Sequence, residues 1–167
     1  PKEVTSDGVY IYEQPLKRHQ YIMTVDVAKG RGQDYSTFNL IDISTNPFSQ
    51  VAVYRNNTIS PLLFPNIIYK YANVYNQAYA IVEANDQGSV VCNGLYYDLE
   101  YENVHVESAV KAGAIGIEIN RKSKRLKKRL VIKKFSSSFL VESIQPFVLL
   151  FSKKLSAKIV FTECSSI

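Results

Sequence analysis

The chain has 167 residues, of which 46% are hydrophobic and 21% are charged. This balance is typical of one compact globular domain and excludes disordered, collagen-like and coiled-coil proteins. No stretch approaches the roughly 18 consecutive apolar residues of a membrane span, and the N-terminus lacks the features of a signal peptide, so we expect a soluble intracellular protein with no membrane partner. Two cysteines and two histidines stand far apart, which excludes a disulfide framework and zinc-ligand spacing. A metal ion would have to be bound by oxygen atoms.

The net charge of +5 is concentrated near the C-terminus, since residues 126–167 carry +6 and residues 1–125 carry −1. A basic run from Arg121 to Lys134 is either a solvated surface or a contact for phosphate groups. Composition changes at the same place, because every tyrosine, glycine and aspartate precedes residue 126. We therefore expect one domain over residues 1–125, and a divergent basic tail over 126–167 that completes this domain or is appended to it.

Three runs rich in β-branched and aromatic residues predict the first strands. A glycine-containing loop and an Asn-Pro turn separate them, as in an antiparallel meander. The runs are residues 20–27, 37–43 and 50–55.

An amphipathic helix is expected next, over residues 61–76. Ser60 is a suitable capping residue, Pro61 a suitable first helical residue, and Pro65 a point where the helix can bend.

The remaining pattern alternates strands and helices. Residues 78–83 predict a short buried strand and residues 87–101 a second helix, with Val91, Leu95 and Leu99 turned inward. Residues 104–107 predict a further short strand. A meander followed by right-handed crossovers gives an α/β fold, with a mixed sheet flanked by helices.

Two carboxylates end strands of this expected sheet. Asp26 ends the first strand and Glu83 the fourth, both within apolar runs where a lone acid would be costly to bury. If these strands are parallel neighbours, both side chains open into one crevice at the carboxyl ends of the strands. Paired acids bind hard cations such as Mg²⁺, and two ions about 4 Å apart can promote phosphodiester cleavage. Alternatively, Asp26 ends a strand before a turn and Glu83 caps a helix.

The loop that follows Asp26 contains glycine and basic residues. Gly30 and Gly32 allow a tight turn, Lys29 and Arg31 can contact phosphate, and Asp34 can reach the metal site or brace the loop. An ordinary hairpin explains the same residues. No Walker motif is present in the sequence, so a nucleotide cradle is disfavoured.

Four separated blocks resemble, in order, the C-terminal nuclease domain of the large terminase subunit of T-even-type tailed phages. The resemblance covers roughly residues 10–125. It implies a ribonuclease-H-like fold, with Asp26 as the first-strand catalytic aspartate, Glu83 as the central glutamate and Asp34 as the aspartate of the GRGQD loop. The blocks are YIMTVDVAKGRGQDYSTFNLIDI, NNTISPLLFPNIIYKYANVYN, AIVEAND and GLYYDLEYENV.

The resemblance further implies a Mg²⁺-dependent endonuclease, with Mn²⁺ as a possible substitute, that cuts concatemeric viral DNA during packaging. Double-stranded DNA would be the substrate, and the ATPase domain, the portal and the small terminase subunit would be partners, in the cytoplasm of an infected bacterium. Six basic residues are candidates for contacts with the DNA backbone. They are Lys29, Arg31, Arg121, Lys122, Lys124 and Arg125.

One departure from the family concerns its third catalytic aspartate, which lies in a His-Asp-Asp-like motif near the C-terminus. No such motif occurs here, and the only acids after residue 125 are Glu142 and Glu163. The resemblance fades after Arg125, which suggests a frameshift, intron read-through or a recombined end, and we expect impaired activity. Two other functions stay open: another ribonuclease-H-like nuclease, such as a junction resolvase or transposase core, and a non-catalytic DNA-binding packaging module.

Overall fold

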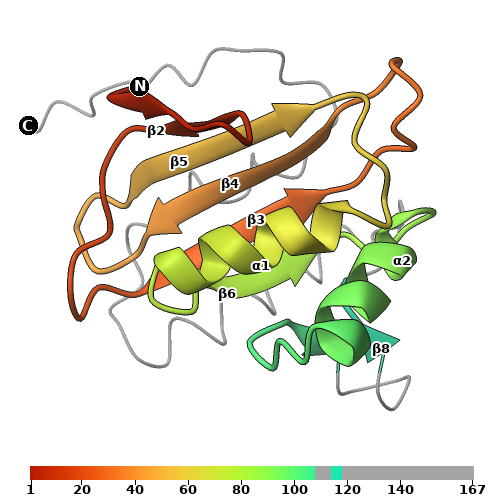
Figure 1. Ribbon diagram of the computed structural model, residues 1–167. Helices are drawn as coiled ribbons and strands as arrows, with labels where there is room; N and C mark the ends of the chain where they lie inside the picture. Colours follow the sequence, from red (N-terminus) through yellow and green to blue (C-terminus); the bar gives the residue numbers. More distant parts are fainter. Residues whose placement is uncertain (108–113, 118–167) are drawn as a thin grey trace, which may run out of the picture.

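A mixed sheet organises the computed structural model, which describes residues 1–107 and 114–117. Within these residues six strands follow one another in the order β1-β2-β5-β4-β3-β6 (Figure 1). Strands β3, β4 and β5 are antiparallel to one another and β6 is parallel to β3, which confirms the expected meander and the α/β class. The strands are β1 (Glu3–Val4), β2 (Val9–Ile11), β3 (Tyr21–Asp26), β4 (Ser36–Asp42), β5 (Ser49–Asn56) and β6 (Tyr79–Val82).

The hairpin formed by β1 and β2 extends the sheet beyond β5 and has no counterpart among the expected elements. Both residues of β1 are exposed, and β2 has only three residues, so neither strand is long enough for its alternation to stand out in the sequence. The hairpin is tied to the first helix, because the Tyr71 hydroxyl lies 2.7 Å from Thr5 Oγ1 and 3.0 Å from Asp7 Oδ2.

The first helix, α1, covers Phe64–Val74 and begins three residues later than predicted. The carbonyl of Ser60 accepts hydrogen bonds from the N–H groups of Leu63 and Phe64, so the chain makes a turn before the helix begins. Pro65 lies in the first helical turn, where its missing N–H has no intrahelical partner to lose. The predicted bend at Pro65 is therefore wrong.

The second helix is also shorter than expected, since α2 covers Gly88–Asn93 and continues as one π-helical turn, η1, over Gly94–Asp98. Val91 and Leu95 are fully buried, as predicted, and Leu99 packs at the edge of the core.

The segment after η1 extends the sheet beyond β6. Val104 forms a parallel bridge with Ala80 of β6. Two further strands, β7 (Val106–Glu107) and β8 (Ala114–Ile115), pair with each other in an antiparallel ribbon.

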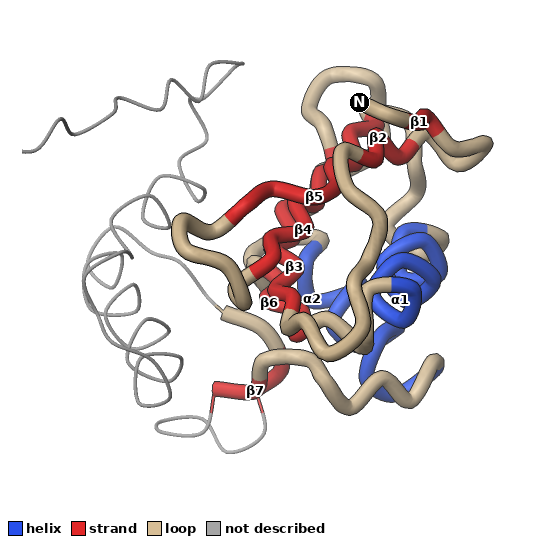
Figure 2. The backbone as a smooth tube through the Cα atoms, turned by 90° about the vertical axis from the view of Figure 1, so that its left-hand side faces the viewer, coloured by secondary structure: helices blue, strands red, loops and turns tan. Residues whose placement is uncertain are grey.

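The sheet has two distinct faces. On the helix face, α1 packs over the strands (Figures 1 and 2), and the large core cluster includes Met23, Val25 and Val82. We call the other side the far face. A smaller cluster of Ile22, Ile81 and Ile117 lies there. In the described part of the chain, no helix is long and apolar enough to cross a membrane.

Candidate functional site

Asp26 and Glu83 lie at matching positions on neighbouring parallel strands. Val25 of β3 and Val82 of β6 are register partners, and the Glu83 N–H donates a hydrogen bond to the Val25 carbonyl at 3.0 Å. Each acid is one residue further along, so both side chains are on the far face, on strands about 4.8 Å apart. The prediction that these two strands are parallel neighbours, with both acids at their carboxyl ends, is confirmed.

Glu83 is held in place by its surroundings. Its side chain is buried, and Asn85 Nδ2 donates a hydrogen bond to Glu83 Oε1 at 2.9 Å. The next strand segment fixes the backbone, because Ile117 donates to the Val82 carbonyl at 2.8 Å and accepts from the Ala84 N–H at 2.9 Å. Asn85 is not among the site residues expected from the sequence, although its position two residues after a strand-terminal acid is a usable signal. The structure therefore presents Glu83 as a buried and oriented carboxylate.

Asp26 is half-buried at the end of β3, and Thr24 precedes it on the same face. Thr24 is only 4% exposed, and its hydroxyl has no hydrogen-bond partner within the part of the chain that the structure describes. This end of β3 thus combines a carboxylate that water can reach with a buried hydroxyl.

The glycine-containing loop after β3 makes a tight turn that is stabilised by contacts with Asn57 and Ile59. Gly30 and Gly32 both have positive φ angles, of 69° and 78°, and a Cβ on Gly30 would lie 2.3 Å from the Ile59 carbonyl oxygen. Asn57 binds the loop at two points, since its carbonyl accepts from the Gly32 N–H at 2.8 Å and its Nδ2 donates to the Gly32 carbonyl at 3.1 Å. The predicted role of the two glycines in a tight turn is confirmed.

The charged side chains of this loop face solvent. Lys29 Nζ lies 3.2 Å from Asp86 Oδ2, so an ion pair joins the loops that follow β3 and β6. Arg31 and Asp34 are exposed. Among residues 1–107 and 114–117, no group of three or more His, Cys, Asp or Glu side chains could hold a metal ion. The structure brings Asp26 and Glu83 together, and the role of Asp34 stays a prediction.

Several predicted site residues lie outside the described residues. They are Arg121, Lys122, Lys124, Arg125, Glu142 and Glu163.

Cys92 lies in α2 and belongs to the large core cluster. The side chain is 1% exposed, and burial raises the pKa of its thiol to about 12. Because the thiolate is the nucleophilic form of cysteine, this residue is not a nucleophile at neutral pH.

The fold is shared with solved phage nucleases, although identity is low. The large terminase nuclease of thermophilic phage G20c with bound cobalt is 18% identical, with a TM-score of 0.55 over 72% of this chain and 55% of that one. The same protein with bound zinc is 20% identical, with a TM-score of 0.51 over 74% and 61%. Its magnesium-bound structure is 19% identical, with a TM-score of 0.49 over 74% and 56%.

The chain thus spans little more than half the length of these nucleases. The expected ribonuclease-H-like mixed sheet is confirmed by the strand order and by this likeness. The family model described as the terminase RNaseH-like domain matches residues 23–137. That match includes Asp26 and Glu83, and the chain belongs to the terminase RNaseH-like domain family.

Proposed function

We propose that this chain is the metal-dependent DNA endonuclease domain of a terminase large subunit of a T-even-type phage, which cuts concatemeric viral DNA during packaging. The observation that carries the proposal is the placement of Asp26 and Glu83 at adjacent positions on the far face, where β3 and β6 end. Two carboxylates at the ends of parallel strands suit a hydrolytic site for a phosphodiester.

The residues present fit a hard divalent cation. Mg²⁺ is commonly held by one or two carboxylates, with water and substrate phosphate completing its coordination. Asp26 and Glu83 can supply those two carboxylates, and related nucleases have been crystallised with cobalt and zinc. A bound cation would activate water and stabilise the leaving oxygen.

The protein's own groups orient the reaction. The hydrogen bond from Asn85 fixes one oxygen of Glu83, so the carboxylate presents a defined edge to a ligand. Asp26, which is half-buried, would be a second carboxylate ligand that water and substrate can reach. Asp34 would act from the glycine-containing loop, either as a further ligand of the cation or by stabilising the loop itself.

Two of the proposed DNA contacts, Lys29 and Arg31, lie in the loop that follows β3. Arg31 is exposed, and Lys29 is exposed but paired with Asp86. Both would contact backbone phosphates without reading the sequence. The proposal extends the same role to four basic residues further along the chain, which are Arg121, Lys122, Lys124 and Arg125.

We expect weak activity, because the family's third acidic ligand has no match in this sequence. The motif that supplies it in the family is absent from the sequence after residue 125. Asp34 or Glu163 would be a partial substitute, whereas Glu142 lies in an apolar stretch. We propose that residues 1–125 form the nuclease domain and that 126–167 are a divergent tail, produced by a frameshift, intron read-through or recombination.

The assay for this function is nicking of supercoiled plasmid by the purified chain, with Mg²⁺ or Mn²⁺. We expect weak nicking with Mg²⁺ and more with Mn²⁺, whose coordination is more tolerant, and we expect Asp26→Asn or Glu83→Gln to abolish it. Glu102→Gln, an exposed acid beyond η1, is the matched control and should leave nicking unchanged.

The outcomes of this assay distinguish the proposed function from its alternatives. Nicking that survives both Asp26→Asn and Glu83→Gln would overturn the site. Strong Mg²⁺-dependent nicking that both substitutions abolish would overturn the expected impairment, and Asp34→Asn and Glu163→Gln would then identify the third ligand. DNA binding without nicking in either metal would favour a non-catalytic packaging module. Cleavage restricted to branched DNA would favour a resolvase-like nuclease.

Membership of the family suggests the substrate, the compartment and the partners of this chain. The chain would act on double-stranded DNA in the cytoplasm of an infected bacterium. The ATPase domain, the portal and the small terminase subunit would be its partners.

A further inference from the structure

One row of residues crosses the far face of the sheet at the level of Asp26. Asp26 is the register partner of Thr37 on β4, and Thr37 is the register partner of Arg55 on β5. Directly opposed residues point to the same face of a sheet. The row therefore runs Glu83, Asp26, Thr37, Arg55, with the two acids at one end and an arginine at the other.

Arg55 is held in a defined orientation. Its Cζ atom lies 3.7 Å from the centroid of the Tyr35 ring, and both side chains are exposed. A guanidinium stacked on an aromatic ring keeps its N–H donors free at the edge, where they match the oxygens of a phosphate. Within residues 1–107 and 114–117 the ion pairs involve other cations, so no carboxylate there neutralises Arg55.

The distance of Arg55 from Asp26 suits a contact with a phosphate near the one that is cleaved. Two strand spacings separate the Cα atoms of Asp26 and Arg55 by about 10 Å. One strand of B-form DNA carries a phosphate about every 3.4 Å along the helix axis. Arg55 would thus meet a phosphate a few nucleotides away from one bound at Asp26 and Glu83.

We propose that Arg55, stacked on Tyr35, binds a non-scissile backbone phosphate of the DNA and positions that strand across the row toward Asp26 and Glu83. This inference rests on the proposed function. Arg55 is a positioning residue, because it acts on a phosphate that is not cleaved. Lys29 differs from it, since its ammonium group is paired with Asp86 in this structure.

The test is binding of a short fluorescent duplex, measured by anisotropy over a series of salt concentrations with Ca²⁺ in place of Mg²⁺. Arg55→Gln should weaken binding about tenfold, and the slope of log K against log salt should become less negative by about 0.9. Arg55→Lys should keep the salt slope, because the charge remains. It should nevertheless bind more weakly, because lysine lacks the planar guanidinium that donates paired hydrogen bonds to a phosphate. Tyr35→Ala should weaken binding as well, and Tyr35→Phe, which keeps the ring, should not.

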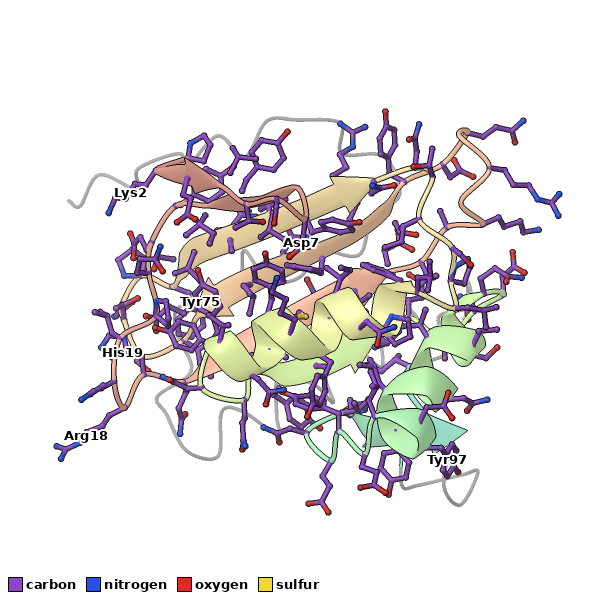
Figure 3. The ribbon with its side chains drawn as sticks, viewed as in Figure 1. Lys2, Asp7, Arg18, His19, Tyr75 and Tyr97 are labelled. Atoms are coloured by element: carbon purple, nitrogen blue, oxygen red, sulfur yellow. The ribbon has the colours of Figure 1, made fainter. Side chains whose placement is uncertain are left out.

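The matched control is Arg18→Gln, which removes the same charge at the amino end of β3. Arg18 lies at the opposite end of the sheet from the β3 and β6 arrowheads (Figure 3). Its substitution should leave the slope unchanged. Circular dichroism and thermal unfolding of each variant would establish that it is folded, and the salt slope is a readout that loss of packing alone does not move.

Three results would count against the inference, and they are distinguishable. Equal binding by the wild-type chain, Arg55→Gln and Arg18→Gln would remove Arg55 from the DNA interface and leave the proposed function intact. Failure of the wild-type chain to bind duplex would overturn both proposals. A loss of affinity in Arg55→Gln that Arg55→Lys fully restores would show a simple charge effect, and the stacked orientation would then be irrelevant.

Discussion

The α-carbon of Gly88 lies directly against the backbone carbonyl of Glu83, and a Cβ built on Gly88 would lie 1.8 Å from that oxygen. The Gly88 N–H also donates to the Asn85 carbonyl at 2.9 Å. The start of α2 is thus packed onto the end of β6, at the residue that we propose as a metal ligand. Only glycine fits at this contact.

Gly88→Ala is therefore expected to destabilise the protein by about 3 kcal/mol, because two rigid backbone segments would have to separate. It should also abolish nicking, since Glu83 would be displaced. Urea unfolding gives the free energy, and plasmid nicking under native conditions gives the activity. Asn93→Ala, at an exposed residue of the same helix, is the control. A Gly88→Ala protein as stable as wild type would contradict the contact.

The two loop glycines should respond differently to alanine. Both have positive φ, so either substitution costs about 1 kcal/mol in backbone conformation. Gly30→Ala would also bring its Cβ to 2.3 Å from the Ile59 carbonyl oxygen, whereas no atom of the described residues lies within 4 Å of a Cβ on Gly32. Gly30→Ala should therefore be clearly the more destabilising in thermal unfolding. Equal effects would show that Ile59 moves away freely.

Asp7 should make stability depend on pH in the acid range. The hydrogen bond from Lys70, with a second from Tyr71, lowers the pKa of Asp7 below its usual value of 3.8. A carboxyl whose pKa is lowered by folding stabilises the protein above its unfolded pKa, and this contribution is lost as pH falls through the folded pKa. Asp7→Asn should thus be slightly less stable than wild type at neutral pH, and the difference should vanish at acid pH.

Urea midpoints measured at neutral and at acid pH would test the role of Asp7, with Asp98→Asn as a control at another exposed acid. The effect should be small, because the Asp7–Lys70 pair is at the surface, where solvent screens it. A difference between Asp7→Asn and wild type that grows on acidification would contradict the direction of the pKa shift.

Cys92 should be unreactive in the folded protein. Burial raises the pKa of its thiol to about 12, and the residue is 1% exposed. In a Cys164→Ser background, a thiol reagent at mildly alkaline pH should label one cysteine in concentrated guanidinium chloride and none in native buffer. Rapid labelling in native buffer would mean that α2 opens readily from β6.

The sequence alone predicts the part of the fold with strong local patterns. Long runs of β-branched and aromatic residues predict β3, β4 and β5, because such runs fit a pleated, half-buried surface. The helix start was misplaced, since Ser60 and Pro61 suit both a helix cap and the turn that the chain adopts. The hairpin of β1 and β2 was missed, because two- and three-residue strands are stabilised by their neighbours and have little local signal.

The sequence by itself also determined that Asp26 and Glu83 end strands, because each acid follows directly on an apolar run. Only the tertiary structure decided that they lie opposite each other on one face, through the parallel register of Val25 and Val82. Likewise, only the tertiary structure aligned Thr37 and Arg55 with Asp26 on that face. Register is set by long-range pairing and packing, and a shift of one residue would turn Asp26 or Glu83 to the helix face.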